Sequence, residues 1–384
     1  MQDSDHYKGR EHSRIKHNLL ESYLEMLFMI IGLNERRICY IDCFSGPWKE
    51  ADEDLSGTSI SLALNVMNNC HNSLRKRGKP VEFRALFVER EKRTYRKLDA
   101  YLKRSQFDGV TMYSMNGEFH NLRDDILRWC GPQDFAFFFI DPTGWKNAIE
   151  IPTLKPLLQR GHSEYLINFM YDFVLRTHTQ KPFQDDMRAI FGEVPDTSGM
   201  SPKDRENFLI KQYRNSLTSI PANHTDRLRS AYVSILDRVK ERTKYHLVYL
   251  TRHPLGIVKF MRASEKMDIV QKRVRAKTKQ QQRIDSTGQP ELFTDEINSD
   301  TKGIMDLEVV KKYWLAILTH KPRVFEIEDL ANMLEETNWF ESNLQQAFNE
   351  LIKEGKVKNL DARGKRPKKP IHFDQKERLQ RTEA

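Results

Sequence analysis

The chain has 384 residues, of which 39% are hydrophobic and 30% charged, and a net charge of +9. This composition indicates a soluble globular protein with a polar surface, and the length suffices for two or three domains. No run of about 18 apolar residues is present, which argues against a membrane helix, and the polar first residues predict a cytoplasmic location without a signal peptide. The four cysteines form no Cys-x-x-Cys pair, so we expect reduced thiols and no metal site.

The first predicted element is a helix from Ser13 to Ile31, whose apolar residues recur at helical spacing and which ends at Gly32. His12, Lys16 and His17 stand near its start. These side chains could face a ligand, but a solvated helix end is the simpler interpretation.

An alternation of apolar strands and amphipathic helices follows and predicts an α/β fold with a doubly wound, mostly parallel sheet. The most apolar strand, 135–140, is typical of a strand covered on both faces. Strands are predicted at 38–43, 82–89, 110–114, 135–140 and 164–170, and helices from 57 onward and at 91–104, 119–129 and 151–159.

Acidic residues stand at the ends of four successive strands: Asp42, Glu89, Glu118 and Asp141. Ligands bind at the carboxyl edge of such sheets, where an acid after the second strand suits a ribose diol. This layout favours a Rossmann-like methyltransferase domain that binds S-adenosylmethionine, although each acid alone is more often a turn or helix cap. The first turn lacks G-x-G-x-x-G, which disfavours a dinucleotide. The predicted cofactor-binding residues are Asp42, Phe44, Ser45, Gly46, Glu89, Asn116 and Glu118.

Several of these segments together resemble the three-Cys-motif partner proteins (TcmP), a bacterial group with a methyltransferase-like domain followed by a winged helix. The resemblance rests mainly on residues 40–47 (YIDCFSGP) and 139–144 (FIDPTG), and also on 57–59, 87–90, 166–169 and 250–256. It implies a partner encoded nearby that carries a three-cysteine motif of iron–sulfur type. This chain has no such motif itself.

The segment Asp141-Pro142-Thr143-Gly144-Trp145 looks like a variant of the [DNS]-P-P-[YFW] motif of amino-methyltransferases. In those enzymes the acid or amide and the proline carbonyl accept hydrogen bonds from the target amine, and the aromatic ring stacks on a flipped base. Here Thr143 replaces the second proline and Gly144 displaces the aromatic residue. The predicted catalytic residues are Asp141, Pro142 and Trp145, with a simple turn as the alternative.

Residues 177–241 are expected to form a helical insertion, with helices at 183–191, 202–217 and 225–241. Tyr171, Asp172 and Arg176 precede it and are placed for substrate contact. A strand at 245–251 and a helix at 255–267 complete the methyltransferase-like domain, residues 1–267. A basic linker is expected at 268–303. His253, in the turn before the last helix, is expected to bond its own backbone.

Residues 304–384 are predicted to form a winged helix-turn-helix with a basic tail, because helical patterns at 306–318, 326–334 and 341–353 precede a short hairpin. Its strands are expected at 355–360 and 371–373. The basic tip suits contact with phosphates of DNA or RNA, and docking to a protein is the alternative. The predicted nucleic-acid contacts are Arg363, Lys365, Arg366, Lys368 and Lys369.

The sequence is therefore compatible with two main functions. One is an S-adenosylmethionine-dependent methyltransferase that acts on a nucleic-acid base or a related amine. The other is a non-catalytic, cofactor-binding or scaffold partner of a three-cysteine protein, in which the winged helix docks to protein or DNA. A third possibility is a winged-helix regulator with a methyltransferase-like sensor domain.

Overall fold

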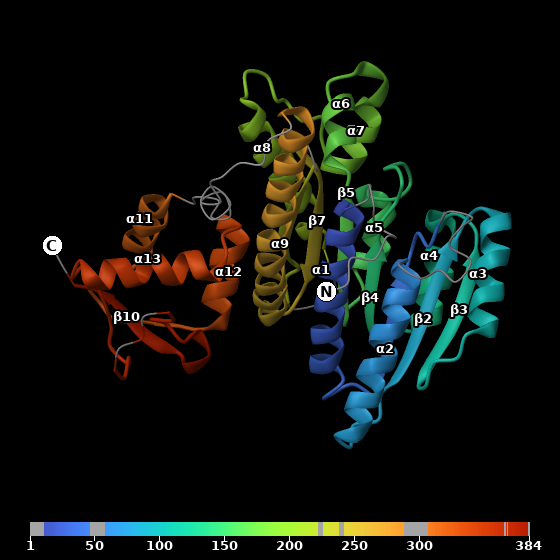
Figure 1. The fold of residues 1–384 in the computed structure, drawn as a ribbon, viewed down its shortest axis with the longest axis horizontal. Helices are drawn as coiled ribbons and strands as arrows, with labels where there is room; N and C mark the ends of the chain where they lie inside the picture. Colours follow the sequence, from blue (N-terminus) through green and yellow to red (C-terminus); the bar gives the residue numbers. More distant parts are fainter. Residues whose placement is uncertain are drawn as a thin grey trace. The chain divides into compact units, whose positions relative to one another are not determined.

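The computed structural model describes residues 11–46, 58–221, 226–237, 242–287, 306–364, 366 and 368–382. The chain divides into two compact units, residues 1–252 and 253–384. Figure 1 shows a large sheet flanked by helices in the first unit, and helices with a small sheet in the second. No helix among the described residues is long and apolar enough to cross a membrane.

The first unit is built on a seven-stranded sheet with the order β3-β2-β1-β4-β5-β7-β6. Neighbours from β3 to β5 run parallel, whereas β7 is antiparallel to both β5 and β6. The chain reverses its direction of winding between β1 and β4, where ligands bind in open α/β sheets. This is the Rossmann-like methyltransferase fold predicted from the sequence. The strands are β1 Arg37–Asp42, β2 Glu82–Glu89, β3 Val110–Asn116, β4 Phe135–Ile140, β5 Ser163–Phe169, β6 Arg229–Leu236 and β7 Thr243–Thr251.

Helices cover both faces of this sheet, which explains why every residue of β4 and β5 is buried. Right-handed crossovers place α2 and α3 on one face, where α1 packs against α2. The opposite face buries an apolar cluster with residues from α4, α5, α7 and α8. The helices are α1 Glu11–Ile31, α2 Ser59–Lys76, α3 Lys92–Arg104, α4 Phe119–Cys130, α5 Ile151–Leu158, α6 Tyr171–Thr177, α7 Gln184–Phe191 and α8 Pro202–Thr218, with a 3-10 turn, η2, at Lys181–Phe183.

The insertion after β5 is helical only as far as α8, so the helix predicted at 225–241 is wrong. The described part of that stretch contains β6, in which Ala231, Val233 and Ile235 are buried on alternate positions. This period of two is the pattern of a strand, and β6 pairs with β7 at the sheet edge. Pairing with β7 therefore determines the secondary structure of this segment, whose composition suits a helix or a strand.

The second unit begins with one long helix, α9 Pro254–Thr287, so the helix predicted at 255–267 continues into the basic stretch. Residues 288–303 of the predicted linker lie outside the described residues. A helix–strand–helix–helix–strand–strand order then forms the winged helix, whose antiparallel sheet has the order β8-β10-β9. The elements are α11 Leu307–Ile317, β8 Arg323–Phe325, α12 Ile327–Thr337, α13 Glu341–Lys353, β9 Val357–Asn359, a 3-10 turn η3 Phe373–Gln375, and β10 Glu377–Arg381.

The core of the winged helix is centred on Trp314 of α11, whose side chain is fully buried. Its ring packs against Phe325 and Phe348, and its indole N–H donates to the carbonyl of Leu344 at 2.9 Å. The return strand of the wing differs from the prediction at 371–373, because β10 begins only at Glu377. Ile371 and Phe373 are instead buried next to the 3-10 turn.

Candidate functional site at the carboxyl edge of the sheet

The turn after β1 is organised by Asp42, whose side chain is fully buried. Its carboxylate accepts the backbone N–H of Phe44 at 3.1 Å and the hydroxyl of Ser59, at the start of α2, at 2.9 Å. Burial raises the pKa of Asp42 to about 6, although both hydrogen bonds oppose this shift. Ser45 donates its hydroxyl to the Asp42 carbonyl and its N–H to the carbonyl of Val88, which fixes the turn against β2.

Glu89 ends β2 directly beside this turn, with 5% of its surface exposed. One carboxylate oxygen accepts the N–H of Glu91 at 2.7 Å. The other lies where a side chain on Gly46 would be, since a Cβ there would come within 2.0 Å of Glu89 Oε2. Burial raises the pKa of Glu89. The structure therefore brings together Asp42, Ser45, Gly46 and Glu89, and a side chain at position 46 would have to displace the Glu89 carboxylate.

Asn116 ends β3 and Glu118 follows it, and the two predicted residues make different contacts. The side-chain amide of Asn116 donates to the carbonyl of Glu89 at 2.8 Å, and thus holds the end of β2. Glu118 precedes α4, keeps 48% of its side chain exposed, and stands 3.7 Å from the guanidinium of Arg90. Phe44 packs its ring against Phe119, with 5.2 Å between ring centroids.

Asp141, at the end of β4, is the centre of a second cluster on the same edge. One of its oxygens accepts the side-chain amide of Asn168 at 2.7 Å, and the other accepts the ammonium of Lys16 from α1. Both members of this ion pair are largely buried, with side-chain exposures of 13% for Lys16 and 19% for Asp141. The expectation that Lys16 belongs to a solvated helix end is therefore wrong. Pro142 is buried in the turn that follows.

Two buried polar atoms close to this cluster have no hydrogen-bond partner among the described residues. They are the carbonyl oxygen of the Asn168 side chain and the hydroxyl of Tyr40. The Tyr40 phenol lies within electrostatic range of Asp42 and Asp141, which help to raise its pKa. Buried polar atoms without partners are rare in folded proteins and commonly mark a site for water or a ligand.

Trp145 is buried in an apolar core. Its side chain is 4% exposed and packs against Phe173 of α6 and Phe183 of η2, with ring centroids 5.6 and 5.5 Å apart. The ring belongs to the apolar cluster on the α5 face of the sheet. This placement contradicts the prediction that Trp145 stacks on a substrate. The inserted Gly144 offers a reason, because it shifts the aromatic residue by one position from the motif.

Tyr171, Asp172 and Arg176, which were placed for substrate contact, lie in α6, the helix that directly follows β5. Asp172 is paired with Arg242 at 2.9 Å, and Tyr171 packs on the ring of His246. His246 itself was not singled out in the sequence. It is 1% exposed, burial lowers its pKa to about 3, and its Nε2 lies 3.4 Å from Glu206 without forming a hydrogen bond.

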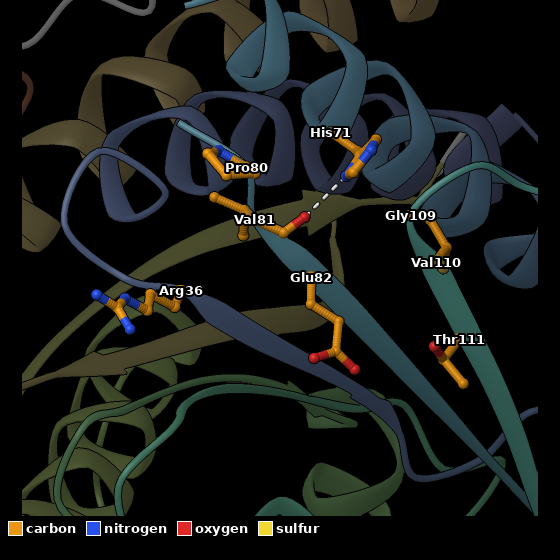
Figure 2. A pocket seen from close by; sticks show the side chains of 8 residues that line it. All are labelled: Arg36, His71, Pro80, Val81, Glu82, Gly109, Val110 and Thr111. Carbon is orange, nitrogen blue, oxygen red and sulfur yellow. Dashed lines mark hydrogen bonds between the residues drawn. The ribbon is translucent and has the colours of Figure 1, made fainter. Parts of the chain in front are cut away.

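A separate hollow of about 480 Å³ lies at the opposite edge, where β1, β2 and β3 begin. Figure 2 shows His71 of α2 pointing to the carbonyl of Val81, which its Nδ1 contacts at 2.8 Å. Arg36, Glu82 and Thr111 are further lining residues. Because parallel strands place their ends on one edge and their starts on the other, this hollow is distinct from the cluster of strand-end acids.

The predicted nucleic-acid residues lie in the wing between β9 and β10. Arg366 is paired with the buried carboxylate of Glu377, whereas Arg363, Lys368 and Lys369 are exposed. Lys365 lies outside the described residues. A cavity of about 590 Å³ adjoins this segment and is lined by residues that include Arg363, Arg366 and Arg378.

Parts of the chain are similar to known proteins. Residues 275–364 match the family model of the GMT-like wHTH domain. Among solved structures, a DUF574 family protein from Streptomyces avermitilis is similar at a TM-score of 0.34 and 9% identity, over 66% of this chain and 92% of that chain. Loganic acid methyltransferase with SAH gives a TM-score of 0.27 and 11% identity, over 92% of each chain. No curated protein matches the chain.

The matched segment begins inside α9 and ends in the wing, so the family model and the observed topology agree on a winged helix. The fold of the first unit rests on its strand order and directions. The chain thus combines a methyltransferase-like domain with a winged helix.

Proposed function

We propose that this chain is an S-adenosylmethionine-dependent methyltransferase whose acceptor is the amine of a nucleic-acid base or a related compound. The observation that carries the proposal is the cluster at the carboxyl edge. There Asp42, Glu89 and Asp141 end adjacent strands, and Asp141 already accepts hydrogen bonds from an ammonium and an amide. A carboxylate that binds the Lys16 ammonium has the chemistry needed to bind a substrate amine.

The described residues fit the cofactor in three ways. Glu89 is a buried carboxylate whose Oε2 occupies the space that a side chain on Gly46 would fill. Asp42 holds the turn against the start of α2. The Tyr40 hydroxyl and the Asn168 side-chain oxygen are buried and have no hydrogen-bond partner in the described part of the chain. We therefore assign Glu89 to the ribose hydroxyls and the turn at Ser45 and Gly46 to the rest of the nucleoside.

The bound cofactor would supply a methyl group activated on a sulfonium. The contribution of the chain is to orient the acceptor. Asp141 would accept a hydrogen bond from the target amine, and Asn168 would hold the carboxylate in place through its 2.7 Å contact. Lys16 must release Asp141 before an amine can take its place. Positioning of this kind supplies much of the acceleration in a displacement reaction.

The second candidate is a scaffold without chemistry of its own, and two observations favour it. Trp145 is buried in the core, and Asp141 is occupied by Lys16. In either case we propose, from the resemblance to the TcmP group, that the chain works with a three-cysteine protein. We also propose that the winged helix binds DNA or RNA through Arg363, Lys368 and Lys369, which are exposed in the wing.

The deciding experiment is transfer of labelled methyl from S-adenosylmethionine to nucleic acid, with and without the three-cysteine protein. Asp141→Ala should remove turnover and leave cofactor affinity within about 1 kcal/mol, because the contact matters mainly in the transition state. Asp134→Ala is the matched control, since Asp134 precedes the same strand at its other end and pairs with Arg37 at 3.2 Å. If no label is transferred in either condition while the cofactor still binds, the scaffold function is correct.

A further inference from the structure

The winged helix carries a strong separation of charge along its sequence. Residues 326–352, which include all of α12 and nearly all of α13, contain seven acidic residues and no Lys, Arg or His. Residues 353–381, which include β9 and β10, contain eleven Lys or Arg residues and four acidic ones. A polyanion is therefore repelled by the helix pair and attracted to the wing.

The start of α13 also contacts another helix of the same unit, although Ser342 stays exposed. Glu341 has a side-chain exposure of only 9% and accepts a hydrogen bond from Arg262 of α9 at 2.5 Å. The next residue, Ser342, donates its hydroxyl to Glu265 of α9. In helix-turn-helix proteins the N-terminal residues of this helix contact the base edges in the major groove. Here these residues contact α9, which also packs along α12.

The wing, in contrast, contains both internal ion pairs and exposed cations. Glu377 is 2% exposed and accepts hydrogen bonds from Asn359, the N–H of His372 and Arg366. Arg378 forms a two-point contact with Asp361, at 2.7 and 3.1 Å. Within each pair the two charges neutralise one another, and both pairs join the segment after β9 to β10.

Exposed cations also remain in the loop between β9 and β10. Arg363, Lys368 and Lys369 form no ion pair among the residues that the structure describes. They are therefore available to an anionic partner at little cost, since no internal pair has to break.

We propose that the wing binds the phosphate backbone of a nucleic-acid duplex without reading its sequence, while α12 and α13 serve as the docking face for α9. The proposal rests on the proposed nucleic-acid partner and specifies how that partner is held. Phosphate contacts fix position but carry no sequence information. The winged helix would thus deliver nucleic acid to the chain and leave the choice of target to the methyltransferase-like domain.

The test uses the full chain and fluorescence anisotropy with labelled duplexes of two unrelated sequences, as DNA and as RNA, over a salt series. The two sequences of each duplex type should bind with equal affinity. The triple variant Arg363→Gln/Lys368→Gln/Lys369→Gln should lose at least about tenfold in affinity at low salt, and its salt slope should fall by about 0.9 for each lost contact. The control is Lys76→Gln/Arg77→Gln/Lys79→Gln, which removes the same charge from an exposed segment of the first unit.

A second variant tests the helix directly. Gln346 and Asn349 are polar and at least partly exposed on α13, so Gln346→Glu/Asn349→Glu should change affinity by less than about twofold. A tenfold loss in this variant, or a clear preference for one sequence, would overturn the proposal and leave nucleic-acid binding intact. Absence of binding to every duplex would overturn both this inference and the nucleic-acid partner, whereas methyl transfer to a free amine would still support the enzyme.

Discussion

Glu89 gives the sharpest test of cofactor binding, because a conservative change alters its charge and little else. In Glu89→Gln, the remaining side-chain oxygen can still accept the N–H of Glu91, which the carboxylate binds at 2.7 Å. The turn should therefore keep its shape. What changes is the negatively charged acceptor facing Gly46, where the ribose hydroxyls are proposed to bind.

The size of the effect follows from the burial of the carboxylate. With 5% of Glu89 exposed, water cannot replace a lost contact. A hydrogen bond to a charged group contributes about 1.5–3 kcal/mol. Glu89→Gln should therefore raise the Kd for S-adenosylmethionine by about 10- to 150-fold.

The assay is calorimetric titration of the folded proteins with S-adenosylmethionine. Glu82→Gln is the control, because Glu82 begins the same strand, is 47% exposed and pairs with Arg37. Since burial raises the pKa of Glu89, affinity of the wild type should fall as the pH drops through that value, and Glu89→Gln should lack this step. Equal affinity of Glu89→Gln and the wild type would refute the assignment of the ribose site.

Three further changes test the same edge and the core beneath it. The pKa of Asp42 is raised from 3.8 to about 6, so its contribution to stability is present at low pH and is lost as the pH rises through about 6. Relative to Asp42→Asn, the wild type should therefore lose up to about 3 kcal/mol of unfolding free energy between pH 4 and 7. Urea denaturation at a series of pH values measures this loss. Gly46→Ala should weaken cofactor binding by pushing a Cβ against Glu89, and its effect should not add to that of Glu89→Gln in a double-mutant cycle; additive effects would mean that the two residues act independently. Trp145→Ala should cost about 3–5 kcal/mol of stability as a core truncation; a normal urea midpoint with weakened substrate binding would instead restore the stacking role.

The five parallel strands of the central sheet, β1 to β5, could be predicted because their signals are local. Residues 135–140 form an uninterrupted apolar run, and burial on both faces requires that composition. Asp42, Glu89 and Asp141 could be placed together for the same reason, since parallel strands bring their ends to one edge. The fold therefore followed from patterns that are contained within single segments.

Other features depend on distant contacts and left no signal of their own. The ion pair of Lys16 joins residues separated by 125 positions. The strand β10 is polar apart from Leu379, whereas the apolar Ile371 and Phe373 nearby suggest a strand that does not form. The burial of Trp145 depends on Phe173 and Phe183, which belong to an insertion whose packing the sequence does not specify.

The position of α1 has a consequence for the order in which the protein folds during synthesis. The phenol of Tyr23 in this helix donates its proton to Glu164 of β5, and its oxygen is also hydrogen-bonded to the hydroxyl of Tyr249 in β7, which lies 226 residues later in the chain. At translation rates of about 5–20 residues per second, the second contact becomes possible only after roughly 10–45 seconds. Until then Leu20, Leu24 and Leu27 of α1, which are buried in the folded protein, lack some of the residues that shield them from solvent. The nascent chain should therefore depend on chaperones. Slower translation should lower the yield of folded protein more than dilution of the completed protein lowers it.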